Sequence, residues 1–190
     1  MKTVPTLLLL ASAWLALTGS SKANCDLTVA RAWQVGRKLP YSVEASSVGP
    51  DCKRAAALMV VRDDKGEVKY SFSAAAKDIG TFGNLAEAPI VDAKKMRVAL
   101  TEWLETGLDS KMNHLSKYPQ WKNGAEGPAE IPPAEFPFTA SSDLTCDTYE
   151  NWRKQNLPVF CFVQGIESER CLVLVKDGSV SEVGIQSFPG

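Results

Sequence analysis

Residues 56–74, AALMVVRDDKGEVKYSFSA, carry the clearest structural pattern in this 190-residue sequence. Residues 63–66 (DDKG) are typical of a turn, and alternating residues flank it on both sides, which predicts a β-hairpin. We expect Arg62 to lie opposite Glu67, because this register gathers the apolar residues on one face and a slip of one residue would exchange the faces. The pairs predicted on the apolar face are Val61 with Val68, Met59 with Tyr70, and Ala57 with Phe72.

An amphipathic helix is predicted after the hairpin, with Asp92 as its N-cap residue. Apolar residues recur there at the spacing i, i+3, i+4, i+7 and i+8, which places them on one face of a helix. Gly107 is a natural stop, although apolar residues beyond it could continue the helix. We interpret Trp103 as a core residue that packs against the sheet rather than as a platform for a ligand. The apolar stripe consists of Met96, Ala99, Leu100, Trp103 and Leu104.

The C-terminal part of the sequence predicts a meander of three strands. The strands are expected at 159–163, 170–176 and 180–188, and Asp177-Gly178 between the last two is a dipeptide that favours a tight hairpin turn. Elsewhere, residues 25–36 predict a short helix, with a strand as the alternative. Residues 38–52 predict irregular or edge structure, and residues 142–155 a short helix.

These elements predict an α+β fold. We expect one antiparallel sheet of about five strands, formed by the hairpin and the C-terminal meander, with the amphipathic helix packed on one face. The composition, with 45% hydrophobic and 23% charged residues, is that of an ordinary globular protein. We expect residues 24–190 to form a single disulfide-containing domain.

Residues 1–23 are predicted to be a cleavable signal peptide. Lys2 precedes an apolar stretch at 7–17, and Ser21-Lys22-Ala23 matches the small-x-small cleavage pattern. The apolar stretch is shorter than the ~20 residues that a membrane-spanning helix needs, and no later stretch is apolar enough to span a membrane. We therefore expect a secreted or periplasmic protein with no transmembrane span after cleavage. Lipidation of Cys25 is a minor alternative, because Lys22 and Asn24 fit that signal badly.

The five cysteines are all retained after cleavage, so they are expected in an oxidising compartment. A bridge between Cys25 and Cys52 would tie the N-terminal region together. If the turn at 164–168 closes symmetrically, Cys161 lies opposite Cys171, and these two could form a cross-strand disulfide. A bridge from Cys146 to one of them is the alternative, and we favour it slightly because it would tie down a loop-rich region. One cysteine must remain unpaired within the chain.

Residues 118–139, YPQWKNGAEGPAEIPPAEFPFT, differ in kind from the rest of the sequence. Five prolines disfavour regular structure, and a loop of this length within a domain is usually functional or disordered. Its aromatic residues suggest a recognition arm, because Tyr and Trp often anchor interfaces. The alternative is that they only attach the loop to the domain. The predicted binding residues are Tyr118, Trp121, Phe136 and Phe138.

Several chemistries lack the residues that they need. The sequence has 21 Lys and Arg against 22 Asp and Glu, which argues against a nucleic-acid-binding protein. The cysteine spacing and the single histidine, His114, do not match a zinc site, and no phosphate-binding loop or nucleophile elbow is present. We therefore expect no metal and no cofactor.

The function expected from these observations is a secreted or periplasmic, non-catalytic binding domain for a protein or a small extracellular ligand. The alternative is an extracytoplasmic hydrolase or thiol enzyme that uses His114 with a free cysteine. A purely structural component of the cell envelope is a third possibility.

Overall fold

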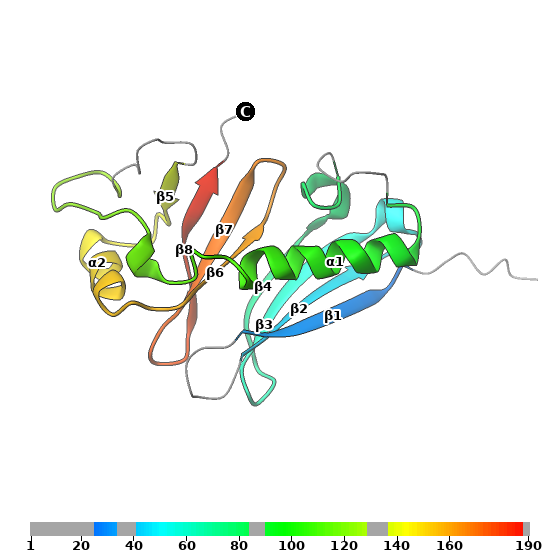
Figure 1. Ribbon diagram of the computed structural model, residues 1–190, viewed down its shortest axis with the longest axis horizontal. Helices are drawn as coiled ribbons and strands as arrows, with labels where there is room; N and C mark the ends of the chain where they lie inside the picture. Colours follow the sequence, from blue (N-terminus) through cyan, green and yellow to red (C-terminus); the bar gives the residue numbers. More distant parts are fainter. Residues whose placement is uncertain (1–24, 34–40, 84–89, 129–136, 188–190) are drawn as a thin grey trace, which may run out of the picture.

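The computed structural model describes residues 25–33, 41–83, 90–128 and 137–187. Within these residues, the first antiparallel sheet contains β1 (Leu27–Trp33), β2 (Tyr41–Val48), β3 (Ala56–Arg62) and β4 (Val68–Ala75), in that order. The second contains β5 (Phe138–Ala140), β6 (Val159–Val163), β7 (Ser168–Leu174) and β8 (Val180–Ser187), in the order β5-β8-β7-β6. The α-helices are α1 (Ala93–Leu108) and α2 (Cys146–Lys154) (Figure 1).

The α+β class is confirmed, whereas the prediction of one sheet with about five strands is wrong. The predicted hairpin and meander belong to two different four-stranded sheets. Each gains strands that the sequence did not reveal: β1 and β2 extend the hairpin, and β5 pairs with β8 at the edge of the meander. The three strands predicted near the C-terminus are all present, as is the short helix α2.

The N-terminal region forms strands. Within the described residues, the predicted helix at 25–36 is therefore wrong and its strand alternative is confirmed, whereas the irregular or edge structure predicted at 38–52 is wrong. Strand β2 lies between β1 and β3 in the interior of the first sheet. Its buried residues alternate with more exposed ones, as expected for a strand with one covered face, but they include small and polar side chains that hide this pattern. These buried residues are Val43, Ala45 and Ser47.

The hairpin is present at the predicted position, but its register differs. Arg62 lies opposite Val68 rather than Glu67, and an irregularity between Val61 and Arg62 moves the rest of the ladder, so that Val61 faces Tyr70. The shift across the ladder is two residues from the predicted one. Because side chains alternate with a period of two, the predicted apolar face still points inward, except at Val68, which lies beyond the irregularity and is exposed.

The amphipathic helix is confirmed, with the Asp92 carboxylate accepting from the Lys95 backbone N–H at 2.9 Å as an N-cap. Trp103 is completely buried, as the core interpretation expects, and its indole N–H donates to the Val163 carbonyl at 2.7 Å. Gly107 does not stop the helix, which continues to Leu108. This glycine instead lies at a close approach between α1 and β6.

The first hydrophobic core lies between the first sheet, α1 and one face of the second sheet. Helix α1 crosses β1 and β2 and also contacts β6 (Figure 1). Phe162 of β6 contacts both α1 and the first sheet, with its ring centroid 6.0 Å from that of Trp103 and 5.2 Å from that of Phe72. Both α1 and β6 therefore cover the same face of the first sheet.

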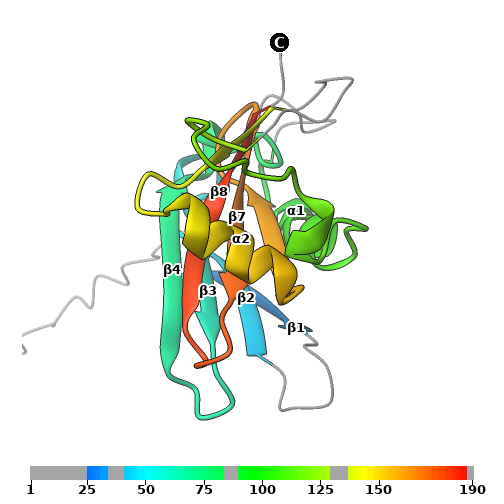
Figure 2. The ribbon, with the colours of Figure 1, turned by 90° about the vertical axis from the view of Figure 1, so that its left-hand side faces the viewer.

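The second hydrophobic core lies on the opposite face of the second sheet, under α2. Figures 1 and 2 show α2 on the side of this sheet that faces away from the first sheet. Phe160 and Phe162 of β6 belong to the first core, and Val159 and Cys161 belong to the second. The second sheet is therefore buried on both faces, which explains why β6 (VFCFV) is apolar throughout.

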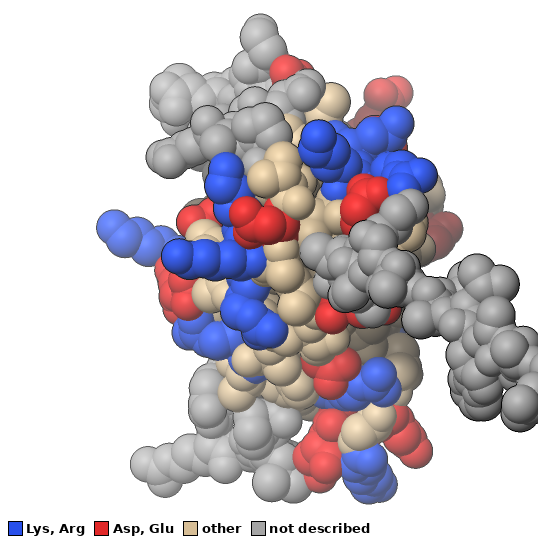
Figure 3. All heavy atoms as spheres, turned by 90° about the vertical axis from the view of Figure 1, so that its right-hand side faces the viewer, with Lys and Arg blue, Asp and Glu red and all other residues tan. Residues whose placement is uncertain are grey.

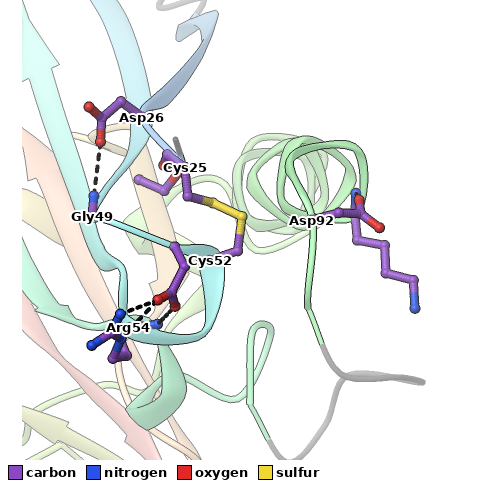
Figure 4. The surroundings of a disulfide bond; sticks show 9 residues. Cys25, Asp26, Gly49, Cys52, Arg54 and Asp92 are labelled. Carbon is purple, nitrogen blue, oxygen red and sulfur yellow. Dashed lines mark hydrogen bonds and ion pairs between the residues drawn. A yellow bond between two sulfur atoms is a disulfide. The ribbon is translucent and has the colours of Figure 1, made fainter. Parts of the chain in front are cut away.

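Two disulfides are present, Cys25–Cys52 and Cys161–Cys171, and Cys146 is free. The first links the start of β1 to the turn after β2 (Figure 4). The slight preference for a bridge from Cys146 is wrong, because the paired strands β6 and β7 place Cys161 directly opposite Cys171. Because Cys161 and Cys171 bond to each other and Cys25 bonds to Cys52, no partner remains for Cys146.

The end of the molecule near the first disulfide carries charges of both signs. Arg54 forms an ion pair with Asp51 in the turn after β2, and the Asp26 carboxylate accepts from the Gly49 backbone N–H at 2.9 Å (Figure 4). Figure 3 shows Lys and Arg side chains interspersed with Asp and Glu and with uncharged atoms on this end.

Candidate ligand-binding groove beside Trp121

Helix α2 holds the first part of the Pro-rich loop in place through side chains that share one helical face. Their spacing of i, i+3, i+4 and i+7 places them on the same side of a helix. Each of these side chains makes a hydrogen bond to the backbone of residues 116–121. The four residues are Cys146, Tyr149, Glu150 and Arg153.

Two of these contacts hold the turn that precedes Trp121. The Arg153 Nε–H donates to the Tyr118 carbonyl at 3.2 Å, and the Tyr149 hydroxyl donates to the Pro119 carbonyl at 2.8 Å. The Tyr149 side chain is fully buried, and burial raises the pKa of its hydroxyl well above the ordinary value. Tyr149 therefore stays a neutral hydrogen-bond donor over the physiological pH range.

The other two contacts fix Trp121 itself. The Glu150 carboxylate accepts from the Trp121 backbone N–H at 2.7 Å, and the Cys146 thiol donates to the Trp121 carbonyl at 3.3 Å. Glu150 also forms a 3.0 Å ion pair with Arg153, and the two side chains are only 14% and 19% exposed. The backbone on both sides of Trp121 is thus attached to one rigid helix.

Three of the four predicted binding residues come together around Tyr149. Tyr118 and Phe138 lie 5.2 Å apart between ring centroids, Phe138 lies 6.3 Å from Tyr149, and Tyr149 lies 5.8 Å from Trp121. Tyr118 and Phe138 are buried, as expected for residues that attach the loop to the domain, whereas Trp121 is partly exposed. Phe136 lies outside the described residues.

Tyr118 sits over the second disulfide. Its hydroxyl lies 3.0 Å from Cys161 Sγ and 3.7 Å from Cys171 Sγ. Burial raises the pKa of this hydroxyl far above its ordinary value, and the charge of Glu169 adds to the effect. The ring therefore covers the disulfide as a neutral group and separates it from solvent.

An open groove of about 560 Å³ lies beside the exposed edge of Trp121. It is bounded by the turn after Trp121, by β5, and by the segment that leads from β5 to α2. Its lining contains aromatic, proline and leucine side chains together with hydroxyl groups. The lining residues are Trp121, Glu126, Gly127, Pro128, Pro137, Phe138, Thr139, Ala140, Ser141, Ser142 and Leu144.

The lining of the groove is about as polar as it is apolar, so a ligand would meet hydrogen-bonding groups as well as apolar surface. Among the lining residues that the structure describes, Glu126 is the one with a charged side chain. The Trp121 indole N–H donates to the Ala125 carbonyl at 2.9 Å, which holds the ring against its own turn. The indole ring is thus held in place before a ligand binds.

Strand β5 is held against β8 by a close backbone approach at Gly184. A Cβ on Gly184 would lie 2.4 Å from the Thr139 carbonyl oxygen and 2.5 Å from the Phe138 ring. Only a residue without a side chain permits this contact. Gly184 therefore positions the strand that forms one wall of the groove.

His114 and Cys146 do not form the pair that a thiol enzyme would need among the hydrogen bonds of the described residues. His114 Nδ1 lies 2.8 Å from the Asn113 side-chain oxygen, and the Cys146 thiol donates a hydrogen bond to the Trp121 carbonyl. Burial raises the pKa of the Cys146 thiol, and the charges of Asp147 and Glu150 raise it further. A nucleophilic cysteine needs the opposite shift.

The described part of the chain contains no group of three or more His, Cys, Asp or Glu side chains arranged to hold a metal ion. It also contains no helix that is long and apolar enough to cross a membrane. No family model matches the chain, and no curated protein and no solved structure shows significant similarity to it. The groove and its surroundings therefore carry the functional argument alone.

Sequence reasoning found the aromatic residues of the site but missed the parts that position them. Tyr149, Glu150 and Arg153 could have been found from their helical spacing with Cys146, because four polar or aromatic residues on one helical face indicate a contact surface. Gly184 within a predicted strand is a second usable signal for close packing. The hydroxyl groups of 139–142 offer no distinctive pattern.

Proposed function

We propose that this protein is an exported, non-catalytic binding domain whose ligand site is the groove beside Trp121. Export is supported by the predicted signal peptide at 1–23 and by the two disulfides, which favour an oxidising compartment outside the cytoplasm. The observation that carries the binding proposal is that Trp121 lines an open groove while its backbone is attached to α2 on both sides.

This arrangement favours binding because the protein loses little freedom when a ligand enters. An indole that is already fixed offers a large apolar surface at a low entropic cost, and hydroxyl groups nearby supply directional contacts. The buried Phe138 is one of the lining residues, and its ring packs against that of Tyr118 at 5.2 Å between centroids. Catalysis is not part of the proposal, since the raised pKa of the Cys146 thiol opposes nucleophilic chemistry.

A fragment screen by NMR tests this proposal. The ¹⁵N-labelled chain 24–190 is mixed with a set of neutral aromatic and aliphatic amide fragments, and the Trp indole N–H signals are followed. We expect the binders to shift the Trp121 indole signal and the amide signals of Thr139 and Ser141. The Trp103 indole signal should not move, because this side chain is buried in the first core.

Matched variants separate a groove effect from a general one. Trp121→Ala should weaken the fragments that bind at least tenfold, whereas Lys122→Ala, at the exposed neighbouring position, should leave them unchanged. Thermal unfolding of both variants verifies that they are folded. The proposal is wrong if the fragments shift signals only outside the groove, or if none bind at millimolar concentration.

A further inference from the structure

Strand β5 is an edge strand with one unpaired side facing away from β8. It pairs with β8 through Phe138 opposite Gln186, Thr139 opposite Ile185, and Ala140 opposite Gly184. In the order β5-β8-β7-β6, no described strand lies on its other side. The unpaired side of an edge strand presents backbone groups that another strand can bind.

The phase of the β5–β8 hydrogen bonds shows which groups are unpaired. The Ser187 N–H donates to the Pro137 carbonyl and the Ser141 N–H donates to the Val183 carbonyl, both at 3.1 Å. Because backbone groups alternate along an antiparallel strand, the N–H and C=O groups of Phe138 and Ala140 point away from β8. Within the described residues these groups have no hydrogen-bond partner.

These unpaired groups occur at the groove already described, since Phe138, Thr139 and Ala140 all line it. Two N–H and two C=O groups, spaced by about 6.8 Å along the strand, match the free side of an extended polypeptide. Trp121 and Leu144 then supply apolar surface for side chains of the bound segment.

We propose that the groove binds an extended peptide segment that carries a Lys or Arg and adds to β5 as a further strand. This inference rests on the proposed function and names its ligand class. We include the basic residue because it would complement the exposed carboxylate of Glu126, which lines the groove and forms no ion pair with any described Lys or Arg. Such strand addition obtains affinity from the backbone and specificity from side-chain pockets.

The short length of β5 limits what it can bind. Strand β5 has only three residues, Phe138–Ala140, and Pro137 before it directs its backbone towards β8 rather than towards the free edge. Short length is a common means of preventing uncontrolled pairing at a sheet edge. The bound segment therefore has about three to five residues in contact, and we expect weak, reversible binding.

The test uses the acetylated and amidated peptide Thr-Val-Lys-Val-Thr-Val and the ¹⁵N-labelled chain 24–190. At saturation the amide protons of Phe138 and Ala140 should move downfield, and their exchange with deuterium should slow at least tenfold. Replacing Lys by Gln in the peptide should weaken binding, and Glu126→Gln should remove the difference between the two peptides. Shifts confined to Trp121, with no protection of these amides, would contradict strand addition.

A proline variant removes one unpaired donor from the edge. Ala140→Pro deletes an N–H that points away from β8, and proline is tolerated at such positions, so we expect at least tenfold weaker binding in a folded protein. Ala30→Pro is the matched control on the other edge strand, β1. The Cys25 N–H donates to the Gly49 carbonyl of the neighbouring chain segment, and backbone groups alternate along β1, so the Ala30 N–H also points away from β2. Ala30→Pro should bind as the unmodified chain does.

Backbone methylation of the peptide tests the same bonds without changing the protein. One analogue carries N-methyl groups on residues 1, 3 and 5 and the other on residues 2, 4 and 6, which block opposite edges of an extended chain. Strand addition predicts that only one analogue loses binding, by at least tenfold. Equal binding of both analogues would overturn the inference.

Two further outcomes would also overturn it. A dimer that forms with rising concentration and disappears in Ala140→Pro would assign the edge to a second copy of the chain. Fragment shifts at Trp121 without any binding of the peptide would leave the proposed function standing and reject its peptide ligand.

Discussion

At the scale of single residues, Gly107 shows how one side-chain hydrogen permits two elements to pack. A Cβ at this position would lie 1.9 Å from the Cys161 carbonyl oxygen and 2.6 Å from the Phe160 ring. Glycine within a helix costs about 1 kcal/mol relative to alanine. Glycine is nevertheless favoured at this position, because any larger side chain would prevent α1 from packing so closely against β6.

Gly107→Ala should therefore destabilise the protein, although alanine is the better helix former. We expect the free energy of unfolding to fall by about 2–3 kcal/mol, the usual effect of overpacking. Urea denaturation followed by circular dichroism measures this change. Gly127→Ala is the control, because a Cβ there meets no atom within 4 Å, and its effect should stay within about 0.5 kcal/mol. Equal stability of the two variants would contradict the close-packing argument.

At the scale of elements, α2 determines the position of the groove through its contacts with residues 116–121. Glu150→Ala removes the acceptor for the Trp121 N–H and leaves the largely buried Arg153 without its ion pair. We expect the free energy of unfolding to decrease by about 2 kcal/mol. The Trp121 amide should exchange with deuterium at least tenfold faster, because its local opening becomes easier.

The control for this prediction is Asn151→Ala, which changes an exposed residue next to Glu150 on the same helix. Its effect on the Trp121 amide should be less than twofold. Unchanged exchange of the Trp121 amide in Glu150→Ala would mean that the loop is positioned by its aromatic residues alone, without α2.

The elements that the sequence predicted well are those with strong periodicity. Helix α1 and the meander strands have clear apolar patterns and turn residues, and they occur where expected. Strand β2 was missed because Ala45 and Ser47 are small inward residues that do not mark a buried face. The hairpin register was missed because an irregularity beside the turn changes the alignment without changing which face is apolar.

The candidate site was only partly predictable for a related reason. Aromatic residues in the Pro-rich loop identify a contact region, but the sequence does not distinguish Trp121, which lines the groove, from Tyr118, which covers a disulfide. That distinction depends on β5, a strand of three residues whose pairing with β8 is a long-range contact. Local patterns cannot specify such a strand.

At the scale of the whole molecule, each disulfide belongs to a different core. Cys25 and Cys52 lie in the first core and Cys161 and Cys171 in the second. The bridges close loops with sequence separations of 27 and 10 residues. By loop entropy they should stabilise the protein by about 3.5 and about 2.8 kcal/mol. Their sum of about 6 kcal/mol is comparable with the total stability of many domains.

The fold should therefore depend on the redox state of its compartment. We expect chain 24–190 to lose about 6 kcal/mol of its free energy of unfolding in a strong reductant such as tris(2-carboxyethyl)phosphine, measured by urea denaturation. Without reductant, Cys25→Ala/Cys52→Ala and Cys161→Ala/Cys171→Ala should each lose about half of this amount, and Cys146→Ala almost none. Peptide mapping of the oxidised chain should find alkylation at Cys146 alone. A reduced chain as stable as the oxidised one would show that the two cores suffice, and the disulfides would then no longer support export.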